Sequence, residues 1–232
     1  EGLVREYNLN FIKRSVTGFF IILPIVLTIL AKSYLIFLSL ISIVSTFAFY
    51  EWLKNNFRHP ILWGLNLIFL YFWFLVIYLV GAASNILPSI TIIESYSSIS
   101  IFYLFFIIII NTTIFDTFAY LFGSSFGKTS IAPNISPNKT FEGFIGGLTA
   151  VLVYALAICY FVNLKYWFLP ICILGGCLAF FGDLLISFHK REKGIKDTGS
   201  LLPGHGGILD RIDSHLLATP IMLLITIISE SL

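Results

Sequence analysis

Long apolar runs separated by short polar segments dominate this chain. Most runs are close to twenty residues, the length that a helix needs to cross roughly 30 Å of hydrocarbon. The pattern predicts spans at residues 15–32, 33–52, 61–81, 98–122, 141–163, 166–187 and 211–230. The first run is too long, and too far along the chain, for a cleaved signal peptide. We therefore expect an all-α polytopic integral membrane protein with about seven transmembrane helices.

The composition agrees with a membrane protein and excludes other classes. Hydrophobic residues make up 58% of the chain and charged residues only 11%, against roughly 25% charged residues in soluble domains. The net charge is +2 and no basic block alternates with aromatic residues, so we expect no nucleic-acid partner. Cys159, Cys172 and Cys177 all lie in apolar runs, without the spacing of a zinc site or a disulfide framework. We expect all three to pack between helices.

The distribution of Lys and Arg indicates the orientation in the membrane. With the N-terminus in the cytoplasm, all 14 Lys and Arg except Lys32 and Lys165 fall on the cytoplasmic side. Cytoplasmic loops of membrane proteins carry such an excess. Two polar loops, residues 123–140 and 188–210, then face the cytoplasm.

The same map divides the chain into two regions. Residues 1–97 form an N-terminal transmembrane region of about three helices, which ends in a polar segment around Pro88. Residues 98–232 form a C-terminal transmembrane region that contains both cytoplasmic loops. Because nearly all polar side chains that could take part in catalysis lie there, we expect the C-terminal region to be catalytic.

Asp183, in "FFGDLLISFHKR", lies near the cytoplasmic end of a predicted span. An isolated carboxylate in that position is costly and is usually functional. On a helix Asp183, Ser187 and Lys190 are spaced i, i+4, i+7 and share one face. The alternative is a structural carboxylate that forms a salt bridge with a neighbouring span.

The segment "KREKGIKDTGSLLPGHGGILDRID" combines cations, glycines and carboxylates. Glycines such as Gly206 and Gly207 permit positive φ, and allow backbone N–H groups to approach phosphates. Asp183 and Asp210 supply two carboxylates from two helix ends, as Mg²⁺ bridging substrate phosphates requires. The role of His205 stays open: it contacts a phosphate, acts as a general acid, or forms a structural hydrogen bond. The combination favours phosphoryl or nucleotidyl transfer.

The earlier loop, "DTFAYLFGSSFGKTSIAPNISPNKTFEGFIGG", faces the same side of the membrane. Asp116 lies within an apolar span and is expected to face the interior of the helix bundle. "GSSFGKT" is not a nucleotide phosphate loop, because it has three residues between its glycines instead of four and no predicted strand precedes it. Lys128 and Lys139 add two cations. Glu142 either caps the next helix or has a catalytic role.

The stretch "SFHKREKGIKDTGSLLPGHGGILDRID" resembles the signature of phosphatidate cytidylyltransferases, also called CDP-diacylglycerol synthases. The matching residues are Ser187, Lys190, Arg191, Lys196, Asp197, Pro203, His205, Gly206, Gly207, Asp210, Arg211 and Asp213. "DTFAYLFGSSFGK" and "ISPNKTFEGFIGG" also resemble that family's second cytoplasmic region, so the resemblance extends over about residues 111–225. On its N-terminal side the chain is more compact than many bacterial members.

The resemblance implies a reaction in phospholipid biosynthesis, in which CTP and phosphatidic acid give CDP-diacylglycerol and pyrophosphate. It implies a bacterial inner membrane with the site facing the cytoplasm, Mg²⁺ held by Asp183 and Asp210, room for a second cation, and a homodimer. We expect catalytic roles for Asp183, Lys190, Arg191, Lys196, His205, Asp210, Arg211 and Asp213. We expect substrate contacts from Asp116, Lys128, Lys139, Ser187, Asp197, Gly206 and Gly207.

Three other functions compete with this hypothesis. The nearest is a related CTP-dependent enzyme that acts on another lipid phosphate or on a polyprenol. A CDP-alcohol phosphatidyltransferase is excluded, because it needs an Asp-Gly pair and the chain has none. A transporter of phosphorylated solutes is disfavoured, because the polar residues gather at one membrane face and the two halves show no repeat.

Overall fold

The computed structural model describes residues 34–65, 101–202 and 206–231, together with Leu23, Val26 and Leu30. Its elements are α2 (Tyr34–Lys54), the π-helix η1 (Pro60–Leu65), α5 (Ile101–Phe126), β1 (Ser130–Ala132), β2 (Ser136–Thr140), α6 (Phe141–Phe161), α7 (Phe168–Glu192), α8 (Leu209–Ile212) and α9 (His215–Ser231). The span predicted at 15–32, most of that at 61–81, and His205 lie outside the described residues. The boundary predicted after residue 97 lies outside them too.

Three described helices are long and apolar enough to cross a membrane: Tyr103–Phe126, Phe141–Phe161 and Phe168–Glu192. They correspond to the spans predicted at 98–122, 141–163 and 166–187, so the mostly helical membrane fold is confirmed. The apolar part of α9, His215–Thr226, is shorter. The total of seven spans and the cytoplasmic N-terminus stay predictions.

Two boundaries and one element differ from the sequence prediction. Helix α7 continues to Glu192, five residues beyond the expected end, so it carries the first cations of the polar segment. The last long helix begins at His215 and not at residue 211, because the short helix α8 and a turn precede it. The loop 123–140 contains an antiparallel hairpin, in which Ser130 pairs with Thr140 and Ala132 with Ser136. The purely helical prediction missed this hairpin.

The junction between β2 and α6 shows why the chain turns there. Thr140 has an extended backbone (φ −110°, ψ 155°), and its hydroxyl accepts a hydrogen bond from Gly143 N at 3.2 Å. A threonine in this conformation satisfies one of the free N–H groups at a helix start. The hairpin therefore leads directly into α6 and places β2 at the end of that helix.

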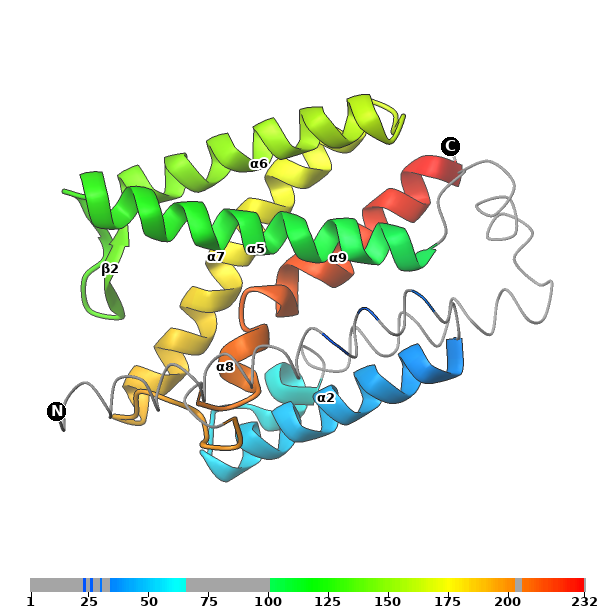
Figure 1. The fold of residues 1–232 in the computed structure, drawn as a ribbon. Coiled ribbons are helices and arrows are strands. Elements are labelled where there is room, and N and C mark those ends of the chain that lie inside the picture. The colour runs from blue at the N-terminus through cyan, green and yellow to red at the C-terminus, as the bar shows by residue number, and fades with distance from the viewer. Residues whose placement is uncertain are drawn as a thin grey trace, which may run out of the picture.

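Small residues bring the long helices close together. A Cβ atom on Gly143 would lie 2.6 Å from the Ala119 carbonyl oxygen, and one on Gly147 would lie 2.9 Å from the Phe115 ring. Glycines at such contacts let membrane helices approach closely. Figure 1 shows α5 and α6 side by side, with α7 crossing them and α9 running along α7.

The buried side chains form two clusters. The larger one joins α5, α6, α7 and α9, and contains Phe115, Val151, Cys172 and Met222. Cys159 is buried in it as well, so the expectation of packing between helices is confirmed for Cys159 and Cys172, whereas Cys177 is only partly buried. The smaller cluster consists of Ala48, Trp52, Phe57, Ile186, Leu209 and Leu216. It attaches α2 to the end of α7 and to α8.

Candidate active site

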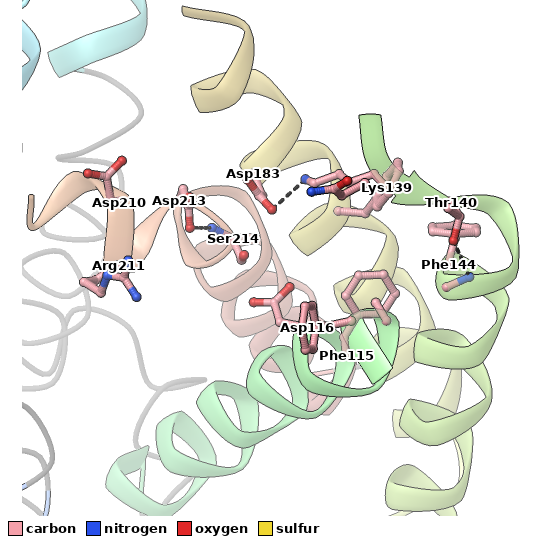
Figure 2. A pocket seen from close by; sticks show the side chains of 15 residues that line it. Phe115, Asp116, Lys139, Thr140, Phe144, Asp183, Asp210, Arg211, Asp213 and Ser214 are labelled. Atoms are coloured by element: carbon pink, nitrogen blue, oxygen red, sulfur yellow. Dashed lines mark hydrogen bonds and ion pairs between the residues drawn. The ribbon is translucent and has the colours of Figure 1, made fainter. Parts of the chain in front are cut away.

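A cavity of about 390 Å³ lies where α5, α6, α7 and β2 meet the turn before α9. Its apolar wall is aromatic, with Phe144 and Phe180 at 4.9 Å between ring centroids and Phe115 beside Phe144. The charged residues that line it are Asp116, Lys139, Asp183, Asp210, Arg211 and Asp213. The cavity therefore gathers acids and cations from both predicted loops over an aromatic wall (Figure 2).

Asp183 and Lys139 form an ion pair across this cavity, with Nζ and Oδ2 separated by 2.6 Å. The Ser187 hydroxyl donates to the other Asp183 oxygen at 3.2 Å, as expected for two residues one helical turn apart. Lys139 also lies 5.1 Å from the centroid of the Phe180 ring. The salt bridge considered as an alternative for Asp183 thus exists, but its partner comes from β2 and not from a neighbouring span.

Asp213 lies between α8 and α9 and accepts a hydrogen bond from Ser214 N at 2.9 Å. Burial raises the pKa of Asp213 to about 7, and the negative charge of Asp183 adds to this shift. Figure 2 shows Asp116, Asp183 and Asp213 around one shared space, with Lys139 next to Asp183. An added cation or proton would relieve the repulsion between these carboxylates.

Asp210 has a different environment from the other acids. Its Oδ1 accepts from Lys190 Nζ at 2.8 Å, and its Oδ2 accepts from the backbone N–H groups of Thr198 at 2.8 Å and Gly207 at 3.0 Å. Burial alone would raise the pKa of Asp210, but these hydrogen bonds outweigh it, so the pKa lies below its usual value. In this structure, donors from the chain itself occupy both oxygens.

Glu51 is a buried carboxylate that the sequence reasoning missed. It lies near the end of α2 and is 4% exposed. It accepts hydrogen bonds from Thr198 Oγ1 at 2.8 Å and from the N–H groups of Ile208 and Leu209, each at 2.9 Å. The argument that singled out Asp183, an acid at the end of an apolar run, applies equally to Glu51 in "FYEWLK" and would have found it.

Two of the expected phosphate-binding glycines contact these acids. Gly206 has φ +81°, the conformation that favours glycine, and an added Cβ would lie 3.0 Å from Asp210 Oδ2. At Gly207 an added Cβ would overlap both Glu51 Oε2 and Thr198 Oγ1. In this structure Gly207 leaves room for Glu51 and donates its N–H to Asp210. Direct contact of these glycines with a phosphate stays a prediction.

Arg191 joins α7 to the hairpin. Its Nε donates to the Ile135 carbonyl and its Nη1 to the Ile195 carbonyl, both at 3.1 Å.

Glu142 was expected either to cap α6 or to have a catalytic role. Its Oε2 accepts hydrogen bonds from the N–H groups of Lys128 at 3.1 Å and Thr129 at 3.2 Å. Glu142 therefore orders the backbone before β1, while Thr140 caps the helix.

The predicted site residues that the structure describes, which are all except His205, fall into three sets. Those that line the cavity are Asp116, Lys139, Asp183, Asp210, Arg211 and Asp213. Those that contact its acids are Ser187, Lys190, Gly206 and Gly207. Lys128, Arg191, Lys196 and Asp197 are exposed and do not line it.

The donor set around the cavity suits a divalent cation that also binds a phosphorylated ligand. Among the described residues no group of three or more His, Cys, Asp or Glu is arranged to hold a metal ion without other ligands. Mg²⁺ usually takes one or two carboxylates and completes its shell with water and substrate phosphates. Asp183 and Asp213 face the same cavity and repel each other, which fits that mode of binding.

The chain was compared with known proteins. The model of the cytidylyltransferase family matches residues 61–228. A phosphatidate cytidylyltransferase of Staphylococcus aureus is 50% identical over 110 residues, which cover 46% of this chain and 42% of the relative. A phosphatidate cytidylyltransferase of Staphylococcus haemolyticus is 48% identical over 110 residues, which again cover 46% of this chain and 42% of the relative. A phosphatidate cytidylyltransferase of Thermotoga maritima is 39% identical over 132 residues, which cover 53% of this chain and 49% of the relative. The matched segment spans less than half the length of each of these relatives.

Proposed function

The chain belongs to the cytidylyltransferase family, and we propose that it transfers the cytidylyl group of CTP to phosphatidic acid. The products are CDP-diacylglycerol and pyrophosphate. The observation that carries the proposal is the cavity itself, where Asp116, Asp183 and Asp213 meet Lys139 and Arg211 over an aromatic wall between membrane-length helices. The names of the similar bacterial proteins support the choice of both substrates.

The reaction needs little covalent chemistry from the protein. A phosphate oxygen of phosphatidate attacks the α-phosphorus of CTP, and the bond from that phosphorus to the bridging oxygen breaks as pyrophosphate leaves. The attacking oxygen is already anionic, so no side-chain nucleophile is required. Catalysis then consists mainly of positioning and of neutralising phosphate charge.

In this proposal the cations of the cavity neutralise the phosphate charge. Lys139 is held next to Asp183 and Arg211 lines the cavity with an exposed side chain, so both can meet phosphate oxygens. Lys190 keeps Asp210 in place through its ion pair and supports the site indirectly. The aromatic wall of Phe115, Phe144 and Phe180 offers an apolar surface to the glycerol end of the lipid and excludes water.

Mg²⁺ is part of this proposal, with Asp183 as its first ligand. The sequence predicts Asp210 as the second ligand, and this stays a prediction; because Lys190, Thr198 and Gly207 donate to its carboxylate, we also propose Asp213 as a ligand. The ion would neutralise charge on the phosphates of both substrates. A second cation is compatible with the further carboxylate of Asp116.

The proposal also includes the cellular setting. A lipid substrate in the bilayer and a polyanion in the aqueous phase can meet only at a membrane surface, and β2, the first turn of α6 and the turn before α9 contribute to the lining of the cavity. We place the site on the cytoplasmic side of a bacterial inner membrane, in agreement with the Lys and Arg distribution. A homodimer stays a prediction from family resemblance.

The decisive experiment measures pyrophosphate release by the full purified chain in mixed micelles of detergent and phosphatidic acid. We expect release only when CTP, lipid and Mg²⁺ are all present, and we expect Asp183→Asn to abolish it. Release without the lipid, or an unchanged rate in Asp183→Asn, would overturn the proposal. Release with a polyprenyl phosphate but not with phosphatidate would assign the chain to a different lipid acceptor.

A further inference from the structure

Glu51 connects the N-terminal part of the chain to the polar segment that leads into the last helix. Its three donors, Thr198 Oγ1, Ile208 N and Leu209 N, lie 147 to 158 residues further along the sequence. The neighbouring Asn55 on α2 strengthens the connection, since its Nδ2 donates to the Thr198 carbonyl at 2.7 Å. One turn of α2 therefore contacts both ends of the segment 198–209.

The Glu51 carboxylate satisfies donors that have no local acceptor. Helix α8 begins at Leu209, and its N-cap residue Ile208 makes no side-chain capping bond. The first N–H groups of a helix need acceptors from elsewhere. Glu51 supplies them from a different helix, with Oε1 bound to Ile208 N and Oε2 to Leu209 N.

The glycines of the segment are shaped around this carboxylate. An added Cβ on Gly199 would lie 2.7 Å from Glu51 Oε1 and 3.1 Å from its Cδ. An added Cβ on Gly207 would overlap Glu51 Oε2. Real Cβ atoms do not approach other atoms so closely, so both positions require glycine as long as Glu51 occupies this space.

We propose that Glu51 is a positioning residue, which fixes the segment 198–213 and thereby sets where Arg211 and Asp213 enter the cavity. Glu51 does not line the cavity, and it lies before the segment 61–228 that matches the family. The catalytic consequence rests on the proposed cytidylyl transfer. The structural consequence, an ordered segment 198–213, does not depend on the reaction.

The first test replaces the carboxylate with an amide in the full chain, Glu51→Gln. One acceptor oxygen then becomes an NH₂ group that faces N–H donors. We expect hydrogen–deuterium exchange at residues 206–212 to accelerate at least tenfold. We also expect kcat for pyrophosphate release to fall about ten- to a hundredfold, because small displacements of catalytic groups slow a reaction by such factors. The KM for phosphatidate should change less than about twofold, because the apolar wall of the cavity is built on α5, α6 and α7.

A matched control is Glu192→Gln. It makes the same chemical change in a glutamate that forms an ion pair with Arg58. Exchange at 206–212 and kcat should both stay at the wild-type values. Equal effects in the two variants would overturn the proposal, because they would indicate a general response to lost charge.

A second test measures the contact itself through a double-mutant cycle. Gly199→Ala should slow catalysis and loosen the segment in the wild-type chain, since its methyl group displaces Glu51. In a Glu51→Ala background the same methyl group has room and should have little further effect. Additive effects of the two substitutions would overturn the proposal.

The outcomes separate this proposal from the proposed function. A wild-type chain without pyrophosphate release overturns the function, while the exchange measurement and the cycle still decide whether Glu51 orders the segment. An active wild type with an active, well-ordered Glu51→Gln overturns the positioning role alone. If Glu51→Gln does not fold, Gly199→Ala carries the test, because it displaces the carboxylate and keeps its charge.

Discussion

The acids near the cavity form two groups that differ in the donors around them. Glu51 and Asp210 form the loop group: both are buried, and N–H groups, a hydroxyl and, for Asp210, an ammonium surround them. Asp183 and Asp213, with Asp116, form the cavity group: they line one space, and Asp183 and Asp213 accept hydrogen bonds from Ser187 and Ser214. Residues 210 and 213 are only three positions apart, yet they belong to different groups.

The difference separates two uses of the same functional group. A buried carboxylate that accepts hydrogen bonds from several donors holds chain segments together. Carboxylates that crowd one another repel and gain stability when a cation arrives. We infer that the loop group maintains the site and that the cavity group reacts with what enters it.

The largest expected effect is the loss of activity in Asp183→Asn. The substitution removes the charge that pairs with Lys139 and that we propose binds Mg²⁺. We expect kcat to fall by on the order of 10²–10³-fold, as for other single groups that stabilise transition-state charge. The thermal midpoint in detergent should change by no more than a few degrees. A rate within tenfold of wild type would move Asp183 out of the reacting group.

The second prediction contrasts Asp210→Asn with Asp213→Asn. The amide at residue 210 would face donors and leave Lys190 without its buried partner, so we expect a loss of about 3 kcal/mol of stability. The amide at residue 213 removes the repulsion from Asp183, so stability should be unchanged or higher while activity falls. Thermal unfolding of both proteins, followed beside pyrophosphate release, checks the contrast. Equal destabilisation by the two substitutions would mean that the two groups do not differ.

The third prediction concerns the space around Glu51. Gly207→Ala should cost about 2 kcal/mol of stability, because its methyl group overlaps Glu51 Oε2 and Thr198 Oγ1. Gly194→Ala is a control in the same polar segment: nothing lies within 4 Å of its added Cβ, and only its φ of +67° opposes the change, at about 1 kcal/mol. Thermal midpoints give the comparison. A larger loss at residue 194 than at residue 207 would contradict the steric argument.

The smallest expected effect is that of Arg191→Ala. Its two hydrogen bonds hold the hairpin to the end of α7, but the side chain is exposed, so stability should fall by less than about 1 kcal/mol. Limited proteolysis between Ala132 and Ser136 should nevertheless become faster. Cleavage at the wild-type rate would show that other contacts hold the hairpin.

The sequence predicted the long helices well because their signal is local. Apolar runs of membrane length correspond to α5, α6 and α7, and the i, i+4 spacing correctly joined Asp183 to Ser187. The turn before α9 could not be predicted in this way, since Asp210 and Asp213 are equally polar and close in sequence. Both line the cavity, and what separates them is that Lys190, Thr198 and Gly207 donate hydrogen bonds to the Asp210 carboxylate.

Contacts over long sequence separations account for the rest. The glycine-rich segment was interpreted through its own composition as a phosphate cradle. Its partner Glu51 lies in an apolar helix about 150 residues earlier, and no spacing rule connects the two. The hairpin was missed for a related reason, because "SIAPNISPNKT" is short and contains two prolines that weaken any strand pattern.

The long separation between Glu51 and its donors also has a consequence during synthesis. The ribosome adds about 5–20 residues per second, so the 147 residues between Glu51 and Thr198 take on the order of ten seconds. Throughout that interval the carboxylate has none of its final donors and must stay in contact with water. We therefore expect the end of α2 to stay at an aqueous surface until residues 198–209 have been synthesised. In nascent chains of the Glu51→Cys variant arrested before residue 198, the thiol should react with water-soluble thiol reagents. In the finished chain that position should be protected.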